Sequence, residues 1–380
     1  MSISNSIYYG LITILETMLR LFPFPTKTGY QRIGHPNADS PVLLTCNFHL
    51  TVLRLKRATR GLHYHLLVAN SKGINVWCAA TGGYLNNHSV ISVIKTSGIE
   101  DKVNHKTIIL PQLAATGVEI KEVKKKTGWT ILWGPVYAKD ISRFFELNFK
   151  STTSMKTIEF KFSQRIEMAI MWIFLISVIL MPIWAPLYKL EAIFLFGQII
   201  LTTLLVYITF PLYAKVFQKE KKRKKAFFSL NNSIVFLINL IYASLGLILY
   251  VVVYKHDTSW ILIRWSIVSF LIVLMMNFDL KGTTPIYKSD SHTDKLFNVK
   301  IDKEKCKGAG VCIEVCPRNC YRMDENIKQV TAPRQQYCVQ CGACIVQCPL
   351  DALYFINKKG EIIKPEIVRK YKLNLMGKRK

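Results

Sequence analysis

The stretch PVLLTCNFHLTVLRLKRATRGLHYHLLVA, residues 41–69, contains two apolar runs separated by a basic segment. The runs at 41–48 and 64–69 have the aliphatic, β-rich composition of buried strands, and residues 50–60 between them have helical spacing. The alternation continues with strand candidates at 107–111 and 129–134 and helix candidates at 87–97 and 119–126. Strands that alternate with helices at this interval predict a Rossmann-like α/β domain with a mostly parallel sheet, over residues 31–150.

A single cysteine lies at the edge of this predicted sheet where ligands are expected. In open parallel sheets, ligands bind beyond the carboxyl ends of the strands, and the loop after residues 64–69 lies at such an edge. That loop contains NVWCAA, residues 75–80, in which Cys78 follows Trp77. Without a second cysteine nearby in the sequence, Cys78 is either a small buried hydrophobe or a lone ligand to a large group. Cys46, inside a predicted strand, is expected to be a core thiol.

The composition combines high hydrophobicity with strong positive charge. The chain has 380 residues, of which 50% are hydrophobic, and a formal net charge of +27. Lysines and arginines gather in KEVKKK at 121–126, in KEKKRKK at 219–225 and in a basic tail at 361–380. This combination is typical of a membrane protein with cationic segments, so a lipid bilayer is an expected partner. No nucleic-acid recognition motif accompanies the charge, and nucleic acid is not an expected partner.

Residues 167–277 are predicted to form a four-helix transmembrane domain. The apolar runs are each near the ~20 residues that span a bilayer as a helix, and they cover 168–188, 192–214, 233–254 and 259–277. Basic residues precede the first run and separate the second from the third. This distribution predicts a multi-pass protein of the cell membrane with both soluble domains on the cytoplasmic side. Arg264, within the last run, is expected to snorkel to the interface or to pair with a neighbouring helix.

Residues 1–30 are predicted to contain an amphipathic helix. Apolar residues from Ile7 to Phe22 recur at helical spacing, and Glu16 and Arg20 interrupt what would otherwise resemble the apolar core of a signal peptide. The helix is expected to pack on the α/β domain or to lie at the membrane surface.

The C-terminal part of the chain has the cysteine spacing of iron–sulfur proteins. Eight of the ten cysteines lie between residues 306 and 348. CVQCGACIVQCP, residues 338–349, has the C-x2-C-x2-C-x3-C-P spacing of two-cluster ferredoxins, in which the fourth cysteine binds the other cluster. CKGAGVCIEVCP, residues 306–317, is the partner motif, with Ala309 at the second ligand position. Residues 297–360 are therefore predicted to form an α+β two-cluster ferredoxin-like domain of the 4Fe–4S type.

The crossover of the fourth cysteine assigns the ligands of the two clusters. One [4Fe–4S] cluster is predicted on four thiols, those of Cys316, Cys338, Cys341 and Cys344. The second, incomplete site has three thiols, those of Cys306, Cys312 and Cys348. It would hold a [3Fe–4S] cluster, a [4Fe–4S] cluster with a non-cysteine ligand, or a [4Fe–4S] cluster completed by Cys320. Such a module transfers electrons and needs an upstream electron donor.

Four stretches of the sequence are similar to motifs of one known family. The stretches are NVWCAA at 75–80, ILPQLAATGV at 109–118, the Gly-Pro pair at 134–135, and MNF and TTP within 276–285. With these residues the chain resembles the corrinoid proteins of mercury methylation, the HgcA family, in which a corrinoid domain also precedes membrane helices. The C-terminal part resembles the family's ferredoxin partner, HgcB, joined here in one chain. The resemblance covers nearly the full length.

The resemblance implies a cobalamin-type corrinoid beside the 75–80 motif, held by Asn75, Val76, Trp77, Cys78, Ala79 and Ala80. Cys78 would be the lower axial ligand of the cobalt, where a strongly donating thiolate favours release of a methyl group from the opposite face. It further implies that the iron–sulfur clusters reduce the cobalt, that a separate methyltransferase supplies the methyl group, and that Hg(II) accepts it. The chain is then a membrane-anchored corrinoid-dependent methyltransferase.

Two alternatives stay open. The family's Gly-Lys-Gly after the motif is Thr81-Gly82-Gly83 here, and the C-terminus lacks the cysteine pair of the family's ferredoxin partner. These differences favour a methyl carrier of one-carbon metabolism with an acceptor other than mercury. The other alternative is a membrane iron–sulfur electron-transfer protein without a corrinoid. His88 or His105 is a rival for the lower cobalt ligand.

Overall fold

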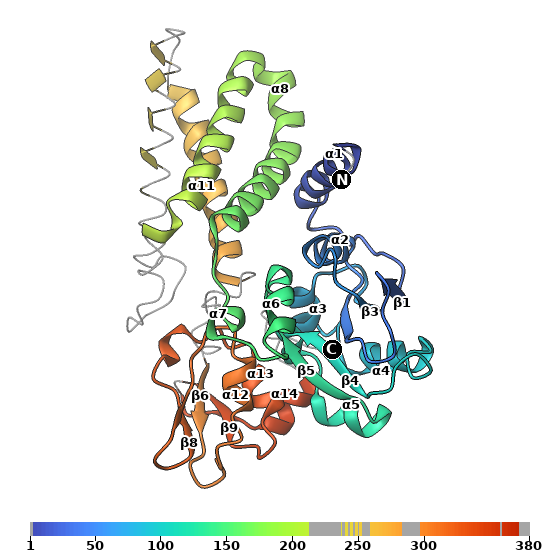
Figure 1. Cartoon of the computed structure of the whole chain (residues 1–380). Coiled ribbons are helices and arrows are strands. Elements are labelled where there is room, and N and C mark those ends of the chain that lie inside the picture. The colour runs from blue at the N-terminus through green and yellow to red at the C-terminus, as the bar shows by residue number, and fades with distance from the viewer. Residues whose placement is uncertain are drawn as a thin grey trace. The chain divides into compact units, whose positions relative to one another are not determined.

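The computed structural model of the chain describes residues 3–212, scattered positions within 237–252, and residues 259–282, 297–357 and 359–371. Figure 1 shows the whole chain. Residues 23–158 and 294–380 form one compact unit, and residues 1–22 and 159–293 form another. The predicted apolar run 233–254 and the end of the predicted basic tail lie largely outside the described residues.

The first unit contains a five-stranded sheet in the order β1-β3-β2-β4-β5. The parallel strands are β2 (Val42–Cys46), β3 (Tyr64–Ala69), β4 (Thr107–Pro111) and β5 (Thr130–Gly134). They match the four predicted strands, and the predicted α/β class with a mostly parallel sheet is confirmed. The edge strand β1 (Gly29–Ile33) pairs antiparallel with β3. It was not predicted, because GYQRI lacks the continuous apolar run of a strand buried on both faces.

Helices cover both faces of this sheet. The predicted helices correspond to α2 (His49–Ala58), α4 (Asn87–Thr96) and α5 (Ile120–Thr127), and the remaining short elements are α3 (Val76–Gly82), η1 (Gln112–Thr116), η2 (Ala138–Asp140), α6 (Ile141–Glu146) and α7 (Thr153–Lys156). Successive residues of β2 point to opposite faces. Leu44 therefore belongs to one hydrophobic core, with α3 and α4, while Leu43 belongs to the other, with α2 and α6.

The cysteine-rich region, residues 297–371, belongs to the same unit. Its three-stranded antiparallel sheet has the order β10-β9-β6 and consists of β6 (Phe297–Ile301), β9 (Leu353–Asn357) and β10 (Ile362–Ile363). A hairpin and short helices complete it: β7 (Arg322–Asp324), β8 (Gln329–Thr331), α12 (Val311–Val315), η5 (Gln335–Tyr337), α13 (Ala343–Gln347) and α14 (Pro365–Tyr371). The segment predicted as a basic tail thus contributes β10 and α14 to the fold.

The second unit is helical. α8 (Phe162–Ile208) covers the first two predicted membrane runs and contains Pro182 and Pro186. It turns back on itself (Figure 1), and the Arg165 Nη1 atom near its start donates to the carbonyl of Ile208 at 2.6 Å. Its two arms, Phe162–Leu187 and Glu191–Ile208, are each long and apolar enough to cross a membrane. α11 (Ser259–Gly282) covers the fourth run, but its apolar stretch among the described residues is shorter, Ile263–Ile272. Two such helices, rather than the predicted four, are therefore found in the described part of the chain.

An ion pair joins α11 to α8. The Arg264 guanidinium donates from Nε to Oε1 of Glu191 at 3.1 Å and from Nη2 to Oε2 at 2.6 Å. The Glu191 side chain is only 6% exposed, so the paired guanidinium offsets much of the cost of a buried carboxylate. The prediction that Arg264 pairs with a neighbouring helix is confirmed.

The predicted N-terminal helix is α1 (Ile3–Met18), and it packs on α8 in the helical unit. The sequence did not predict this contact with α8. Its apolar side chains are exposed, including Leu11 at 63% and Ile7 at 57%, whereas Glu16 is buried. The helix therefore turns its apolar face outward and a polar face toward α8. Its location at a membrane surface stays a prediction.

Candidate functional site

The helix that carries Cys78 is short and sharply bounded. α3 begins after Asn75, whose side-chain Oδ1 accepts a hydrogen bond from the backbone N–H of Cys78 at 3.0 Å. It ends at Gly83, which has a left-handed φ of 81°. An N-terminal asparagine cap and a left-handed glycine are favourable ends for a helix, so the sequence itself fixes this element. The backbone of Cys78 is thereby held in the first turn of α3.

Cys78 is exposed, although the residues on either side of it in α3 are buried. Trp77, Ala79 and Ala80 are at most 5% exposed, whereas Cys78 is exposed. The interpretation of Cys78 as a buried core thiol is therefore wrong. Cys46 is 0% exposed, which confirms its assignment to the core, and burial raises the pKa of its thiol.

Small residues allow α3 to lie close to η1. A side chain at Gly117, just after η1, would collide with the carbonyl oxygens of Leu85 and Ala80. Ala79, Ala80 and Ala115 are fully buried in the same core. Within residues 109–118, it is η1 that packs against α3, the helix of Cys78.

A cavity of about 120 Å³ lies at the carboxyl ends of the parallel strands. Residues from the ends of β2, β4 and β5 line it, among them Thr45, Pro111 and Gly134. Val76 of α3 also lines this cavity. The predicted ligand edge of the sheet therefore has both a cavity and an exposed thiol on the helix that borders it.

His105, a rival for the lower cobalt ligand, does not lie at this edge. His105 precedes the first residue of β4, and its Nε2 lies 3.1 Å from the Ser40 carbonyl. It is therefore at the amino end of the strand, opposite the cavity, which argues against a role as rival ligand. His65 is buried in β3, where its ring nitrogens lie 3.1 Å from Tyr30 Oη and 2.9 Å from the Asn37 carbonyl. His88 lies in the first turn of α4.

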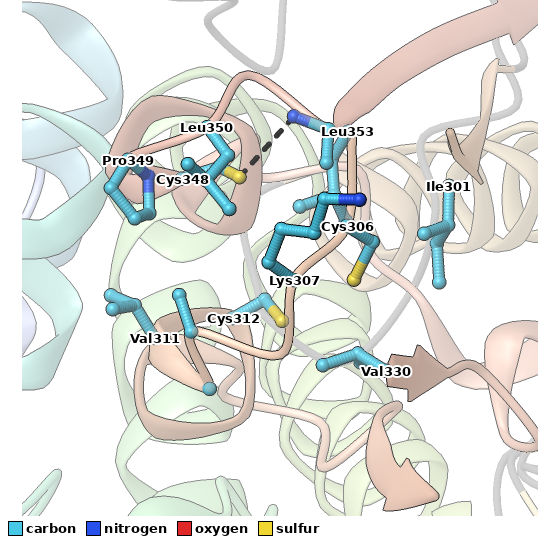
Figure 2. Close-up of a pocket in the computed structure, with 13 residues that line it drawn as sticks. Ile301, Cys306, Lys307, Val311, Cys312, Val330, Cys348, Pro349, Leu350 and Leu353 are labelled. Carbon is cyan, nitrogen blue, oxygen red and sulfur yellow. Dashed lines mark hydrogen bonds between the residues drawn. The ribbon is translucent and has the colours of Figure 1, made fainter. Parts of the chain in front are cut away.

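The cysteine-rich region gathers its thiols into two groups. The first thiol group, which lines one cavity, consists of Cys316, Cys338, Cys341 and Cys344. The second thiol group, which lines another (Figure 2), consists of Cys306, Cys312 and Cys348. These are the two sets that the crossover of the fourth cysteine predicts. Within the described residues, no three histidine, cysteine, aspartate or glutamate side chains lie close enough to hold a single metal ion.

Hydrogen-bond donors point at several of these sulfur atoms. The backbone N–H groups of Gln340 and Ala352 donate to Cys338 Sγ and Cys348 Sγ, each at 3.4 Å. The Tyr321 hydroxyl donates to Cys344 Sγ at 3.1 Å. Such donors stabilise negative charge on sulfur, and in iron–sulfur proteins they tune the reduction potential. The Cys spacing does not reveal Tyr321, because its position relative to Cys344 depends on the fold.

Burial keeps several of the thiols protonated in the metal-free chain. Desolvation, together with the nearby Cys348 and Cys306, raises the pKa of Cys312 to about 12. Desolvation also raises the pKa values of Cys341 and Cys344 well above their ordinary range. A metal that binds here must therefore displace protons, and its binding is expected to be stronger at higher pH.

Cys320 belongs with the first thiol group. Its backbone N–H donates to Cys316 Sγ at 3.4 Å. Hydrogen bonds of its side chain to Cys316 and Cys338 raise its pKa. It does not line the cavity of Cys306, Cys312 and Cys348. The hypothesis that Cys320 completes the second thiol group is therefore wrong, because the chain after Cys316 returns toward Cys338.

Both Cys-Pro corners of the cysteine-rich region are bound to the α/β region, residues 23–158. Gln347, which is 7% exposed, donates from Nε2 to the carbonyls of Ala115 at 2.7 Å and Val118 at 2.6 Å. Its Oε1 accepts from the backbone N–H of Ile120 at 3.3 Å. At the other corner, the Pro317 carbonyl accepts from the Ile158 N–H at 2.8 Å. Sequence reasoning did not identify Gln347, because its partners are more than 220 residues away.

Apolar contacts extend this interface toward Cys78. Val315 and Ala343, from α12 and α13, belong to the same hydrophobic core as Ala79, Ala80 and Ala115. η1 packs against α3 on one side and contacts α12 and α13 as well. A continuous packed path therefore connects the cysteine-rich region to the helix of Cys78.

Comparison with known proteins assigns a relationship to the α/β region. Residues 19–145 match the family described as CO dehydrogenase/acetyl-CoA synthase delta subunit. The Archaeoglobus fulgidus acetyl-CoA decarbonylase/synthase complex subunit gamma is 33% identical over 128 residues, which is 33% of this chain and 27% of that protein. The corresponding subunit of Methanothermobacter thermautotrophicus is 36% identical over 134 residues, covering 33% and 29% of the two chains. The chain thus spans less than a third of either relative.

Proposed function

We propose that the α/β region binds a corrinoid and acts as a methyl carrier of one-carbon metabolism, and that iron–sulfur clusters in the same chain supply it with electrons. The observation that carries this proposal is the exposed Cys78 on a capped helix beside a cavity at the carboxyl ends of β2, β4 and β5. It lies within the residues similar to subunits of a complex named for the synthesis and cleavage of acetyl-CoA. That similarity supports a carrier of one-carbon metabolism better than it supports a mercury methyltransferase.

The residue beside Cys78 offers a hydrogen-bond donor to a bound group. Trp77 is buried, and its Nε1 has no hydrogen-bond partner among the described residues. A buried N–H without a partner is costly, so it is available as a donor to a bound group. When bound, a corrinoid supplies a cobalt atom that receives a methyl group from one protein and passes it to an acceptor. In this scheme Asn75 fixes the backbone of Cys78, whose sulfur would be available as a soft donor to the cobalt.

The two thiol groups fit iron–sulfur clusters by number, spacing and surroundings. Four thiols and three thiols line separate cavities, and N–H and O–H donors reach their sulfur atoms. When bound, such clusters accept and release single electrons. The chain's own residues would hold them on mostly buried thiols and keep the clusters close to the α/β region. We therefore propose a ferredoxin-like role for residues 297–371.

The hydrogen bonds of Gln347 hold the proposed electron donor, the cysteine-rich region, against the α/β region. They hold the residue next to Cys348 against η1, which supports α3 and Cys78. Lys121 Nζ adds a hydrogen bond to the Pro349 carbonyl at 2.8 Å. Donor and acceptor sites in one unit need no diffusional encounter for each turnover. The proposal therefore makes electron transfer intramolecular.

The partners and location proposed for the chain follow from its helical unit and its chemistry. The two arms of α8 are proposed to anchor the protein in the cell membrane as a multi-pass protein, with its soluble regions on the cytoplasmic side. A methyl donor requires a partner methyltransferase, and the clusters require an upstream electron donor. The exposed apolar residues of α1 are consistent with contact to lipid.

Metal content tests the proposed function. The full chain, purified without oxygen in detergent, is expected to contain cobalt and iron and to absorb as a corrinoid in the visible range. Iron without cobalt would instead support a membrane electron-transfer protein. Methylation of Hg(II) stays a second candidate, supported by the resemblance of NVWCAA to the mercury-methylation proteins. Equal methylmercury formation by cells with and without the gene would exclude it.

A further inference from the structure

The two cysteine loops of the cysteine-rich region have the same backbone conformation. Gly310 and Gly342, which precede α12 and α13, both have a φ of 75°. Two residues earlier in each loop, Gly308 has a φ of 71° and Gln340 a φ of 56°. In both loops, therefore, one position lies between two residues that have a left-handed backbone conformation. Ala309 and Cys341 occupy that middle position.

The loops therefore differ in a ligand and not in shape. Cys306 and Cys312 flank Ala309 at the same separations at which Cys338 and Cys344 flank Cys341. Ala309 lines the cavity of the second thiol group, together with Lys307 and the three thiols. Those thiols are the only cysteine, histidine or acidic side chains among the residues that line it, all of which lie in the described part of the chain. The structure consequently retains a ligand position whose side chain has no donor atom.

The position at Ala309 faces solvent. Ala309 and Lys307 are exposed, whereas Cys306, Cys312 and Cys348 are at most 7% exposed. Figure 2 shows the three sulfur atoms around a common space, with the Lys307 side chain beside it. A cationic ammonium at the edge of the cavity favours an anion there. A small ligand can thus reach this corner of the cavity from outside.

We propose that the second thiol group holds a [4Fe–4S] cluster whose corner at Ala309 binds a small thiolate from solution. This inference rests on the proposed iron–sulfur function and adds to it a ligand-exchange site. Thiolate sulfur is the donor that the other three corners already use, and Fe–S clusters favour soft ligands. Its binding donates a lone pair to iron and displaces solvent, without any change in oxidation state. The first thiol group, with Cys341 in place, is closed to such exchange.

The ligand-exchange site can be tested with 2-mercaptoethanol on the full chain. The reduced protein, titrated without oxygen, is expected to show a saturable change in the EPR spectrum of one cluster and no change in the other. Ala309→Cys supplies the fourth thiol within the chain, so its spectrum is expected to resemble that of the saturated wild type and to lose the response. Ala309→Gly, which adds no donor atom, is the control and should keep the response.

Three results would overturn the inference. A wild-type spectrum indifferent to 2-mercaptoethanol, with iron present for both clusters, would exclude exchange at Ala309. An oxidised [3Fe–4S] signal that persists when ferrous iron is added would mean that this corner holds no iron at all. A response retained at full strength in a folded, iron-loaded Ala309→Cys chain would place the exchange elsewhere. By contrast, a chain that binds no iron at all would contradict the proposed function itself.

Discussion

Cysteine occurs in two different settings in the first unit of this protein. Cys78 is a single exposed thiol on a seven-residue helix, whereas Cys312, Cys344 and Cys348 are at most 7% exposed and face other thiols. The four thiols of the first thiol group can enclose a metal cluster with protein ligands alone, whereas the three thiols of the second group need one further ligand. The single thiol needs a guest that brings the remaining ligands with it. A candidate cluster ligand is thus distinguished from a candidate cobalt ligand by its burial and its neighbouring thiols, since both are cysteines.

The largest effect is expected when the grouped thiols are broken up. Cys344→Ala removes a ligand of the first thiol group, so the chain is expected to lose roughly half of its iron, because one of two clusters then lacks a ligand. Iron analysis and visible absorption measure this. Cys320→Ala is the matched control, since Cys320 is equally buried beside the same group but is not an assigned ligand. Full iron content in Cys344→Ala, or the same loss in both variants, would contradict the assignment.

Removing the single thiol is expected to change the cobalt and leave the fold intact. Cys78 is exposed, so Cys78→Ala should change the free energy of unfolding by less than about 0.5 kcal/mol. It should nevertheless alter the visible spectrum of the bound corrinoid. Cys46→Ala is the reverse control: it should cost roughly 0.5–3 kcal/mol because Cys46 is fully buried, and it should leave the spectrum as it is. An unchanged cobalt spectrum in Cys78→Ala would remove its role as ligand.

The connection between the two kinds of thiol is expected to depend on Gln347. Gln347→Ala leaves the carbonyls of Ala115 and Val118 without their side-chain donor, at an expected cost of about 1–3 kcal/mol. Intramolecular reduction of the cobalt should slow, while the iron content stays the same. Stopped-flow absorbance after addition of a chemical reductant measures the rate. Gln329→Ala, which removes an exposed hydrogen bond to Lys303 within the cysteine-rich region, is the control and should leave the rate unaffected.

The smallest effect concerns pH and the buried thiol of the α/β region. Burial raises the pKa of Cys46 in the folded chain, so the folded state keeps a proton that the unfolded state loses above the ordinary thiol pKa of about 8.5. The contribution of Cys46 to stability is therefore full below that pH and falls as the pH rises through the raised value. Denaturant unfolding of wild type and Cys46→Ala between neutral and alkaline pH checks this. If the free energy of unfolding of the two proteins changed with pH in the same way, the prediction would be contradicted.

The fold of the α/β region was largely predictable, because its central strands are buried on both faces and therefore read as continuous apolar runs. The two thiol groups were predictable as well, since their spacing within each motif is local. The positions of Cys320, Tyr321 and Gln347 were not, because each depends on contacts made only after the chain folds back. The placement of α1 was missed because its apolar residues face outward, so periodicity alone did not indicate what the helix packs on.

Addition of cobalamin to the cobalt-free full chain tests the central claim most directly. Under anaerobic conditions the account predicts saturable binding, followed by absorbance, that protects Cys78 from alkylation by iodoacetamide and that is weakened by prior alkylation of Cys78. Cys46, being buried, should stay unmodified throughout. Absence of saturable binding, or alkylation of Cys78 at the same rate with and without cobalamin, would contradict the account.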